Sequence, residues 1–349
     1  MNRLLTRGAG LVAGCALAVL ATGPSSPRLL AQSPPAIPPP AQGQAAGLAP
    51  GVVLDTPRDH IADLIPGVVA AGEKVELLSP NVNGGDGIIG LPDGSAVFLE
   101  LREGLVIRID PDRTFSTIAK APGVKSIGAD KDGNVIALLK DSFEIVYPAA
   151  NTKVLAAGAD GLSLTTCNDF VVTNNGGIYA SDVGQYNQPK YNQPTGIVYI
   201  PKGGKARVVA DSKETMALPN GIVMSPDEKT LYAVDSRNNS GMAWDVLPDG
   251  SLANPRAFAK YRITEALDRD FTLQANGAAI DADGRLYVAM PLGVQVFSKG
   301  GTYLGHIPTT LKIQSVSFAG PKKEYLYMLA QRAVWRVKTT ARGYMPRAK

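Results

Sequence analysis

Cysteine and histidine are scarce in this chain of 349 residues, which contains two of each. Cys15 lies in an apolar N-terminal stretch, so Cys167 is the only thiol in the rest of the chain. A single thiol cannot form an internal disulfide, and we expect Cys167 to be buried. His60 and His306 are far apart in sequence, and with one thiol they cannot build a zinc site. Soft-metal chemistry is therefore excluded as a function.

The chain also carries little net charge outside its N-terminal stretch. The net charge is +4, but Arg3, Arg7 and Arg28 all precede the first acidic residue. Removing these three positive charges leaves about +1 for the rest of the chain, which is not the footprint of a nucleic-acid-binding protein. Aromatic residues make up only 6%, whereas 37 glycines and 26 prolines indicate many turns. We therefore expect no nucleic-acid partner. We also expect the protein to be a monomer that binds a small-molecule substrate.

No apolar run is long enough to span a bilayer comfortably. The run at 8–22 follows two arginines, which is typical of a secretory signal. We predict a signal peptide over residues 1–31, with cleavage after Ala21 or Ala31, and export to the periplasm or the extracellular space. Alternatively, residues 11–15 form a lipoprotein box and the chain is lipidated at Cys15.

Beyond the signal, composition divides the chain into three parts. Residues 32–51 are rich in proline and alanine and are predicted to be a disordered or polyproline-like tether. Residues 52–340 hold alternating apolar runs without a convincing amphipathic helix, so we assign them to one globular domain. Residues 341–349 form a C-terminal tail.

Short polar turns recur through the globular part at intervals of roughly forty to sixty residues, as expected for propeller blades. Each turn separates two runs that alternate like strands, and further strands follow. The prediction is an all-β fold, a six-bladed β-propeller with four-stranded blades, in which a strand within 68–78 closes one blade. A β-sandwich or two smaller β domains is the rival fold. The turns are Pro92-Asp93-Gly94, Lys131-Asp132-Gly133, Asn174-Asn175-Gly176, Pro226-Asp227-Glu228, Ala282-Asp283-Gly284 and Pro321-Lys322-Lys323.

An Asn-Gly dipeptide, typical of turns, stands instead where the first strand of a predicted hairpin begins, at Asn220. The first strand of a propeller blade is innermost, so Asn220 is expected at the mouth of the central channel. Equivalent positions in three other blades are Asp86, Asn168 and Asn276. Four oxygen-bearing side chains would suit a hard cation such as Ca²⁺ or Mg²⁺. Alternatively, each Asn has only a structural role, because asparagine tolerates a left-handed backbone and can cap a turn.

Two longer segments lie on the predicted channel-mouth face. Residues 182–195 repeat Tyr-Asn-Gln-Pro and include Tyr186 and Tyr191, and residues 262–274 include Asp270. Such polar loops on a rigid scaffold are candidates for substrate contact. The alternative is that they are solvated insertions.

The sequence around these positions resembles the SMP-30/gluconolactonase/LRE-like family. The resemblance is carried by Pro219-Asn220-Gly221, by the stretch 225–236 and by the stretch 277–289. It implies a six-bladed propeller with a divalent cation, usually Ca²⁺, at the channel mouth. It also implies hydrolysis of a lactone or a related ester as the activity.

Two positions depart from the family pattern. Asp86 stands where the family has a glutamate ligand, and Asn276 stands where it has an aspartate that also serves as the general base. An amide cannot accept a proton at neutral pH, so Asn276 cannot do that work. Asp86 or Asp270 would have to be the base, or a metal-bound hydroxide would act alone.

These departures leave two functions open. In the first, the chain is an exported, metal-dependent lactone or ester hydrolase with catalytic positions Asp86 and Asn276. In the second, the propeller binds a small molecule or a partner without turnover.

Overall fold

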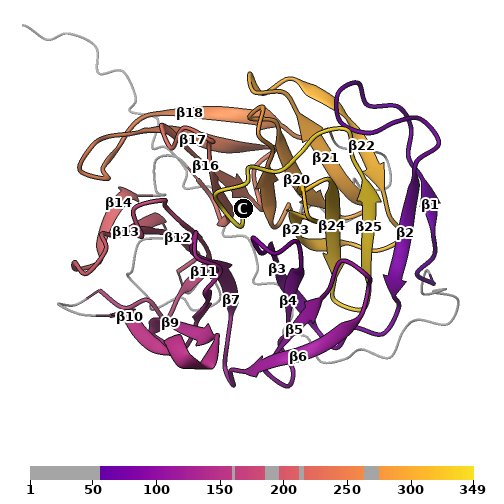
Figure 1. Cartoon of the computed structure of the whole chain (residues 1–349). Helices are drawn as coiled ribbons and strands as arrows, with labels where there is room; N and C mark the ends of the chain where they lie inside the picture. The colour runs from indigo at the N-terminus through magenta and orange to yellow at the C-terminus, as the bar shows by residue number, and fades with distance from the viewer. Residues whose placement is uncertain (1–55, 159–161, 185–195, 212–215, 263–274) are drawn as a thin grey trace, which may run out of the picture. The chain divides into compact units, whose positions relative to one another are not determined.

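The computed structural model describes residues 56–158, 162–184, 196–211, 216–262 and 275–349. These residues form six antiparallel sheets that stand around a common axis (Figure 1). A 3₁₀ turn at Ala149–Asn151 is the one helical element among them. No helix in the described ranges is long and apolar enough to cross a membrane. The predicted six-bladed β-propeller is confirmed.

The inner strands are neighbours around the axis, one from each blade. The end of the axis where these strands begin is called the site end below, and the end where they finish is called the far end. The inner strands are β3 (Gly85–Gly90), β7 (Ser126–Ala129), β11 (Cys167–Val172), β15 (Pro219–Met224), β19 (Ala278–Ile280) and β23 (Ile313–Ala319).

Each inner strand is followed outward by the second, third and fourth strands of its blade. In blade one these are β4 (Ala96–Glu100), β5 (Leu105–Ile109) and β6 (Phe115–Lys120), and in blade two β8 (Val135–Leu138), β9 (Ser142–Tyr147) and β10 (Lys153–Ala157). In blade three they are β12 (Ile178–Asp182), β13 (Gly196–Ile200) and β14 (Arg207–Asp211), and in blade four β16 (Thr230–Asp235), β17 (Ser240–Val246) and β18 (Leu252–Lys260). In blade five they are β20 (Leu286–Met290), β21 (Gly293–Phe297) and β22 (Tyr303–Pro308), and in blade six β24 (Tyr325–Ala330), β25 (Val334–Lys338) and β2 (Lys74–Ser79).

Blade six is closed by the N-terminal strand, as expected from the sequence. β2 pairs antiparallel with β25, with Val75 opposite Val337, and β1 (His60–Ile61) adds a short outer strand. This pairing joins the first and last parts of the propeller in one sheet and so closes the ring of blades.

The core lies between adjacent sheets. Side chains from both faces of each central strand are buried, because every blade packs against two neighbours. Between blades five and six, Trp335, Tyr287 and Val316 are fully buried in one cluster. Cys167 is buried next to Phe170 in the cluster between blades two and three, which confirms its expected burial.

The polar turns connect first and second strands at the far end. In most of them the third residue is a glycine with positive φ, as at Gly94 with φ of 89° and Gly284 with φ of 83°. An L residue is strained in this conformation, so glycine is the usual choice. Blades four and six instead carry Glu228 and Lys323 at this position, with φ of 57° and 48°.

Candidate functional site

The inner strands of blades one, three and four each have a β-bulge at the site end. The pairing register shifts between Asp86 and Ile88 in β3, between Cys167 and Phe170 in β11, and between Pro219 and Ile222 in β15. A bulge re-aims the side chains of the extra residues. The predicted Asn168 and Asn220 lie within these bulges, and Asp86 directly precedes Gly87, the unpaired residue of the bulge in β3. The fourth predicted residue, Asn276, lies just before β19, and its carbonyl accepts a hydrogen bond of 3.0 Å from the Gly221 amide.

Close backbone approach explains why glycine follows two of these asparagines. A Cβ atom on Gly221 would lie 2.4 Å from the carbonyl oxygen of Asn276. A Cβ atom on Gly277 would lie 2.8 Å from the carbonyl oxygen of Gln314 in blade six. Both distances are too short for any side chain. The two Asn-Gly dipeptides therefore mark places where neighbouring inner strands touch, and neither is a hairpin turn.

The amide of Asn220 is held in one orientation by Ser236. The Ser236 hydroxyl donates its only proton to the carbonyl of Ala275, at 2.6 Å. It must therefore accept in its contact with Asn220, and the Asn220 Nδ2 donates to it at 3.0 Å. Because Nδ2 is engaged there, the carbonyl oxygen of the amide is directed away from Ser236 and is available to a ligand.

Asn276 is held in a similar way by blade six. Its Nδ2 donates to the Gln314 Oε1, so the amide oxygen of Asn276 is also left for another partner. The Asn168 side chain has no hydrogen bond to any described residue in the structure. All three asparagines can thus offer an oxygen at the site end.

Asp86 is the one carboxylate among the four predicted residues. Its Oδ1 accepts a hydrogen bond of 2.8 Å from the Gly87 amide. Burial, together with the negative charge of Asp169, raises the pKa of Asp86 to about 6. The ammonium groups of Lys349 and Lys312 act in the opposite direction on that pKa. Asp86 is therefore ionised at neutral pH in a site where its charge is poorly solvated.

Asp169 links three inner strands and was not singled out by sequence reasoning. Its Oδ1 accepts from the Ser126 hydroxyl of β7 at 3.1 Å, and its Oδ2 accepts from the Ile222 amide of β15 at 3.3 Å. Lys349, near the C-terminal end of the chain, also donates to Oδ1. A signal for Asp169 was present, because it directly follows Asn168. No local signal pointed to Lys349.

The residues at the site end fit a hard divalent cation but not a soft one. Amide and carboxylate oxygens are the ligands that Ca²⁺ accepts. Among the described residues, no cluster of three or more His, Cys, Asp or Glu side chains could hold a metal. A cation here would depend on Asp86 and on the amide oxygens of Asn168, Asn220 and Asn276, and one carboxylate supports weaker binding than two.

A cavity of about 330 Å³ opens at the site end of blade six, between the start of β23 and the β24–β25 connection. The Gly84 and Gly85 amides both donate to the carbonyl of Gln331, which places the β24–β25 connection against the start of β3. The cavity is lined by Leu311, Lys312, Gln314, Ala330, Gln331 and Arg332.

Tyr186, Tyr191 and Asp270, predicted to contact substrate, lie outside the described residues.

The fold is a six-bladed β-propeller. The carboxylate and amide oxygens described above form a polar site where its inner strands begin. The family model described as SMP-30/gluconolactonase/LRE-like region matches residues 85–332, most of the propeller. The chain belongs to this family.

Individual relatives are distant. A gluconolactonase from Zymomonas mobilis is 25% identical over 195 residues, which are 52% of this chain and 53% of that protein. The chain thus spans about half the length of that relative. A gluconolactonase structure from Xanthomonas campestris superimposes with a TM-score of 0.68 at 21% identity, covering 82% of this chain and 95% of that one. Regucalcin from Agrobacterium tumefaciens, a calcium-binding protein, gives 0.60 at 16% identity, covering 78% and 96%.

Proposed function

We propose that the protein hydrolyses a lactone or a related small ester at the site end, with the help of a divalent cation, Ca²⁺ in the first instance. The observation that carries this proposal is the shared placement of Asp86, Asn168 and Asn220 at the β-bulges of three inner strands. Similarity to gluconolactonases supports the class of substrate.

The chain's own residues divide the work. Asp86 and the amide oxygens of Asn168, Asn220 and Asn276 would hold the cation, which supplies polarisation of a substrate carbonyl and acidification of a water. Asp86, with a pKa of about 6, is mainly ionised at pH 7 and is the one group of the four able to accept a proton. Asn276 can bind an oxygen or donate a hydrogen bond but cannot act as a base.

The cavity at the site end of blade six provides room for the substrate. Its volume of about 330 Å³ is within the usual range for small-molecule sites. Gln314 and Gln331 from blade six line it, and they offer hydrogen-bonding groups suited to the hydroxyl groups of a sugar-derived lactone.

A second function is binding without turnover. It is favoured by Asn276, whose amide replaces the expected base and is held by Gln314. In this function the cation and the cavity would bind a sugar, another small molecule or a partner, and no proton would need to be removed.

Hydrolysis assays on the purified propeller distinguish the two functions. We expect a panel of sugar-derived and aromatic lactones to be opened slowly by the native chain, and EDTA to abolish this activity. Restoration by added Ca²⁺ would identify the metal as necessary. Calcium binding without any hydrolysis across the panel would reject the enzyme and support the binding function.

We also propose that the chain is exported and acts as a monomer. The N-terminal arginines followed by an apolar run support export. Expression in a bacterial host followed by fractionation tests this, because retention of the full-length chain in the cytoplasm would contradict it.

A further inference from the structure

The C-terminal segment, residues 341–349, lies at the axis of the propeller. Figure 1 places the C-terminal end of the chain among the inner strands. The carbonyl of Ala348 accepts a hydrogen bond of 2.8 Å from the Ser317 hydroxyl in β23. The Arg347 guanidinium donates to the carbonyls of Met224 and Ser225 at the end of β15, both at 2.8 Å. The segment is therefore bound to the far end of several blades.

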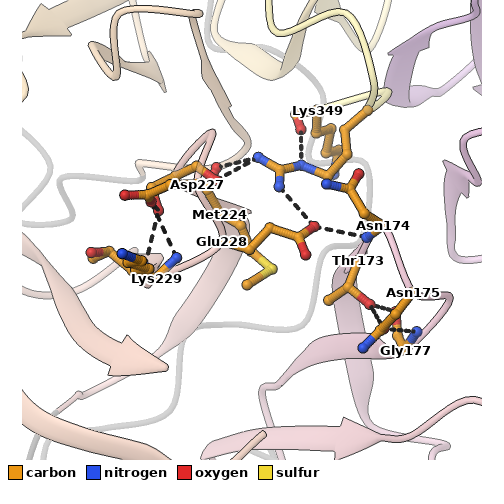
Figure 2. Close-up of polar contacts among 12 residues, drawn as sticks. Thr173, Asn174, Asn175, Gly177, Met224, Asp227, Glu228, Lys229 and Lys349 are labelled. Carbon is orange, nitrogen blue, oxygen red and sulfur yellow. Dashed lines mark hydrogen bonds and ion pairs between the residues drawn. The ribbon is translucent and has the colours of Figure 1, made fainter. Parts of the chain in front are cut away.

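The two unusual turn residues hold this segment. Glu228, in the turn of blade four, accepts from the Arg347 guanidinium at 3.0 Å and from the backbone N–H of Asn174 in blade three at 2.7 Å (Figure 2). Lys323, in the turn of blade six, donates to the carbonyls of Tyr344 and Arg347. Both adopt positive φ where other blades have glycine. Local strain of this kind persists where the surroundings require the side chain, and here each side chain anchors the C-terminal segment.

The segment ends in a buried ion pair beneath the candidate site. The Lys349 side chain is 2% exposed and that of Asp169 is 10% exposed. Asp169 directly follows Asn168, and its Oδ2 binds the amide of Ile222, two residues after Asn220. The Lys349 ammonium thus meets a carboxylate that is built into the same bulges as two of the candidate cation ligands. The charges of both Asp169 and Lys349 reach Asp86.

We propose that the C-terminal segment supplies a resident counter-ion, the Lys349 ammonium, which neutralises Asp169 beneath the site and so weakens the attraction of the site for a divalent cation. This inference rests on the cation of the proposed function but not on hydrolysis.

The sign of the effect follows from the charges. Asp86 and Asp169 together would present two negative charges to a cation at the site end, and the ammonium of Lys349 removes one of them. Interactions between charges are strong in such a buried region because water screens them little. Loss of Lys349 should therefore tighten cation binding. A residue that served only to hold the fold would weaken binding or leave it unchanged when lost.

Calcium titration calorimetry of four purified proteins tests the proposal. They are the native chain, Lys349→Met, Asp169→Asn, and the double variant Lys349→Met/Asp169→Asn. We expect Lys349→Met to bind Ca²⁺ roughly tenfold or more tightly than the native chain. Asp169→Asn, which leaves the ammonium without its carboxylate, should bind Ca²⁺ more weakly. The double variant restores the native charge balance and should bind with nearly native affinity.

Conservative and thermal controls complete the test. Lys349→Arg keeps the charge and should keep the native affinity. The rise in Tm that 5 mM Ca²⁺ produces, a concentration of the order used for weak sites, should be larger for Lys349→Met than for the native chain. If Lys349→Met does not fold, the comparison of Asp169→Asn with the double variant still carries the test, because only the first retains an unpaired ammonium.

Two results would overturn the proposal. One is weaker or equal Ca²⁺ binding by Lys349→Met alongside native binding by Lys349→Arg. The other is an absence of Ca²⁺ binding by all of the proteins. A protein that binds Ca²⁺ with the expected order of affinities but opens no lactone would sustain this inference and reject the hydrolase.

Discussion

The ammonium of Lys349 and the carboxylate of Asp169 form an ion pair across 180 positions of sequence. The pair joins the last residue described to the inner strand of blade three, and both side chains are buried. Asp169 is also the acceptor for groups from blades two and four. One carboxylate therefore fastens three blades and the C-terminal segment together directly beneath the candidate site.

Removing the ammonium should cost stability because it leaves a buried charge without its partner. Lys349→Met is expected to lower the free energy of unfolding by about 3 kcal/mol in the presence of EDTA. Most of this loss should be recovered in the double variant with Asp169→Asn. Urea denaturation measures both values, and Lys202→Met, at an exposed lysine, is the control. A double variant less stable than either single variant would show that the pair is not coupled in this way.

Asn276→Asp should increase the rate of lactone hydrolysis. The new carboxylate adds a second negative charge at the site and a group that can accept a proton, a role typically worth about a hundredfold or more in rate. The neighbouring Gln314 can accommodate the change, because turning its amide presents a donor in place of the acceptor that Asn276 now uses.

The matched control for this change is Asn168→Asp, which adds the same charge elsewhere in the ring. Both variants should bind Ca²⁺ more tightly than the native chain, but only Asn276→Asp should raise kcat in lactone hydrolysis. Equal activation by the two would mean that charge alone, and not a base at position 276, limits the reaction.

Much of the fold could be predicted because its signals are local. The turn at Asp283-Gly284 has a glycine with positive φ, and the alternating run Leu286–Met290 follows it directly. Such units repeat along the chain, so six blades could be counted without any long-range information. The dipeptide Asn220-Gly221 was also informative, although for a different reason from turn formation: Gly221 is needed where the backbone of Asn276 approaches.

The rest of the site depends on contacts that no local pattern encodes. The Ser236 hydroxyl accepts from Asn220 only because it donates its own proton to the carbonyl of Ala275, 39 positions away in the sequence. Gln314 occupies the bulge of blade six, where the register shifts between Ile313 and Ser315, but an Ile-Gln-Ser sequence has no distinctive turn chemistry. Nothing in the sequence near Lys349 indicates Asp169 as its partner.

The orientation of Asn220 can be tested through Ser236. Ser236→Ala removes the acceptor that holds the Asn220 Nδ2, so the amide can turn and its oxygen is no longer fixed. We expect a loss of Ca²⁺ affinity of about tenfold and a loss of stability of about 1–2 kcal/mol, because the Ala275 carbonyl also loses a donor. Calorimetry and urea denaturation measure the two effects.

Asn220→Ala is the stronger form of the same test. It should abolish Ca²⁺ binding with little effect on unfolding, because β15 keeps its backbone hydrogen bonds to β16. Ser225→Ala, a buried serine at the far end of the same blade, is the control that should change stability but not Ca²⁺ affinity. Extensive unfolding of Asn220→Ala would instead assign Asn220 a purely structural role in its bulge.

Lys323 makes the attachment of the C-terminal segment dependent on pH. Burial lowers the pKa of Lys323 to about 8, below the ordinary value near 10.5 that it regains on unfolding. Between these two values the unfolded chain binds more protons than the folded one, so the contribution of Lys323 to stability rises with pH through this window and is least below pH 8. Relative to Lys323→Met, the native chain should gain about 2 kcal/mol of unfolding free energy between pH 7.5 and 9.5. Urea denaturation of both proteins at the two pH values measures this difference. A constant difference would mean that the hydrogen bonds to the Tyr344 and Arg347 carbonyls keep the ammonium charged throughout, and that burial does not govern its titration.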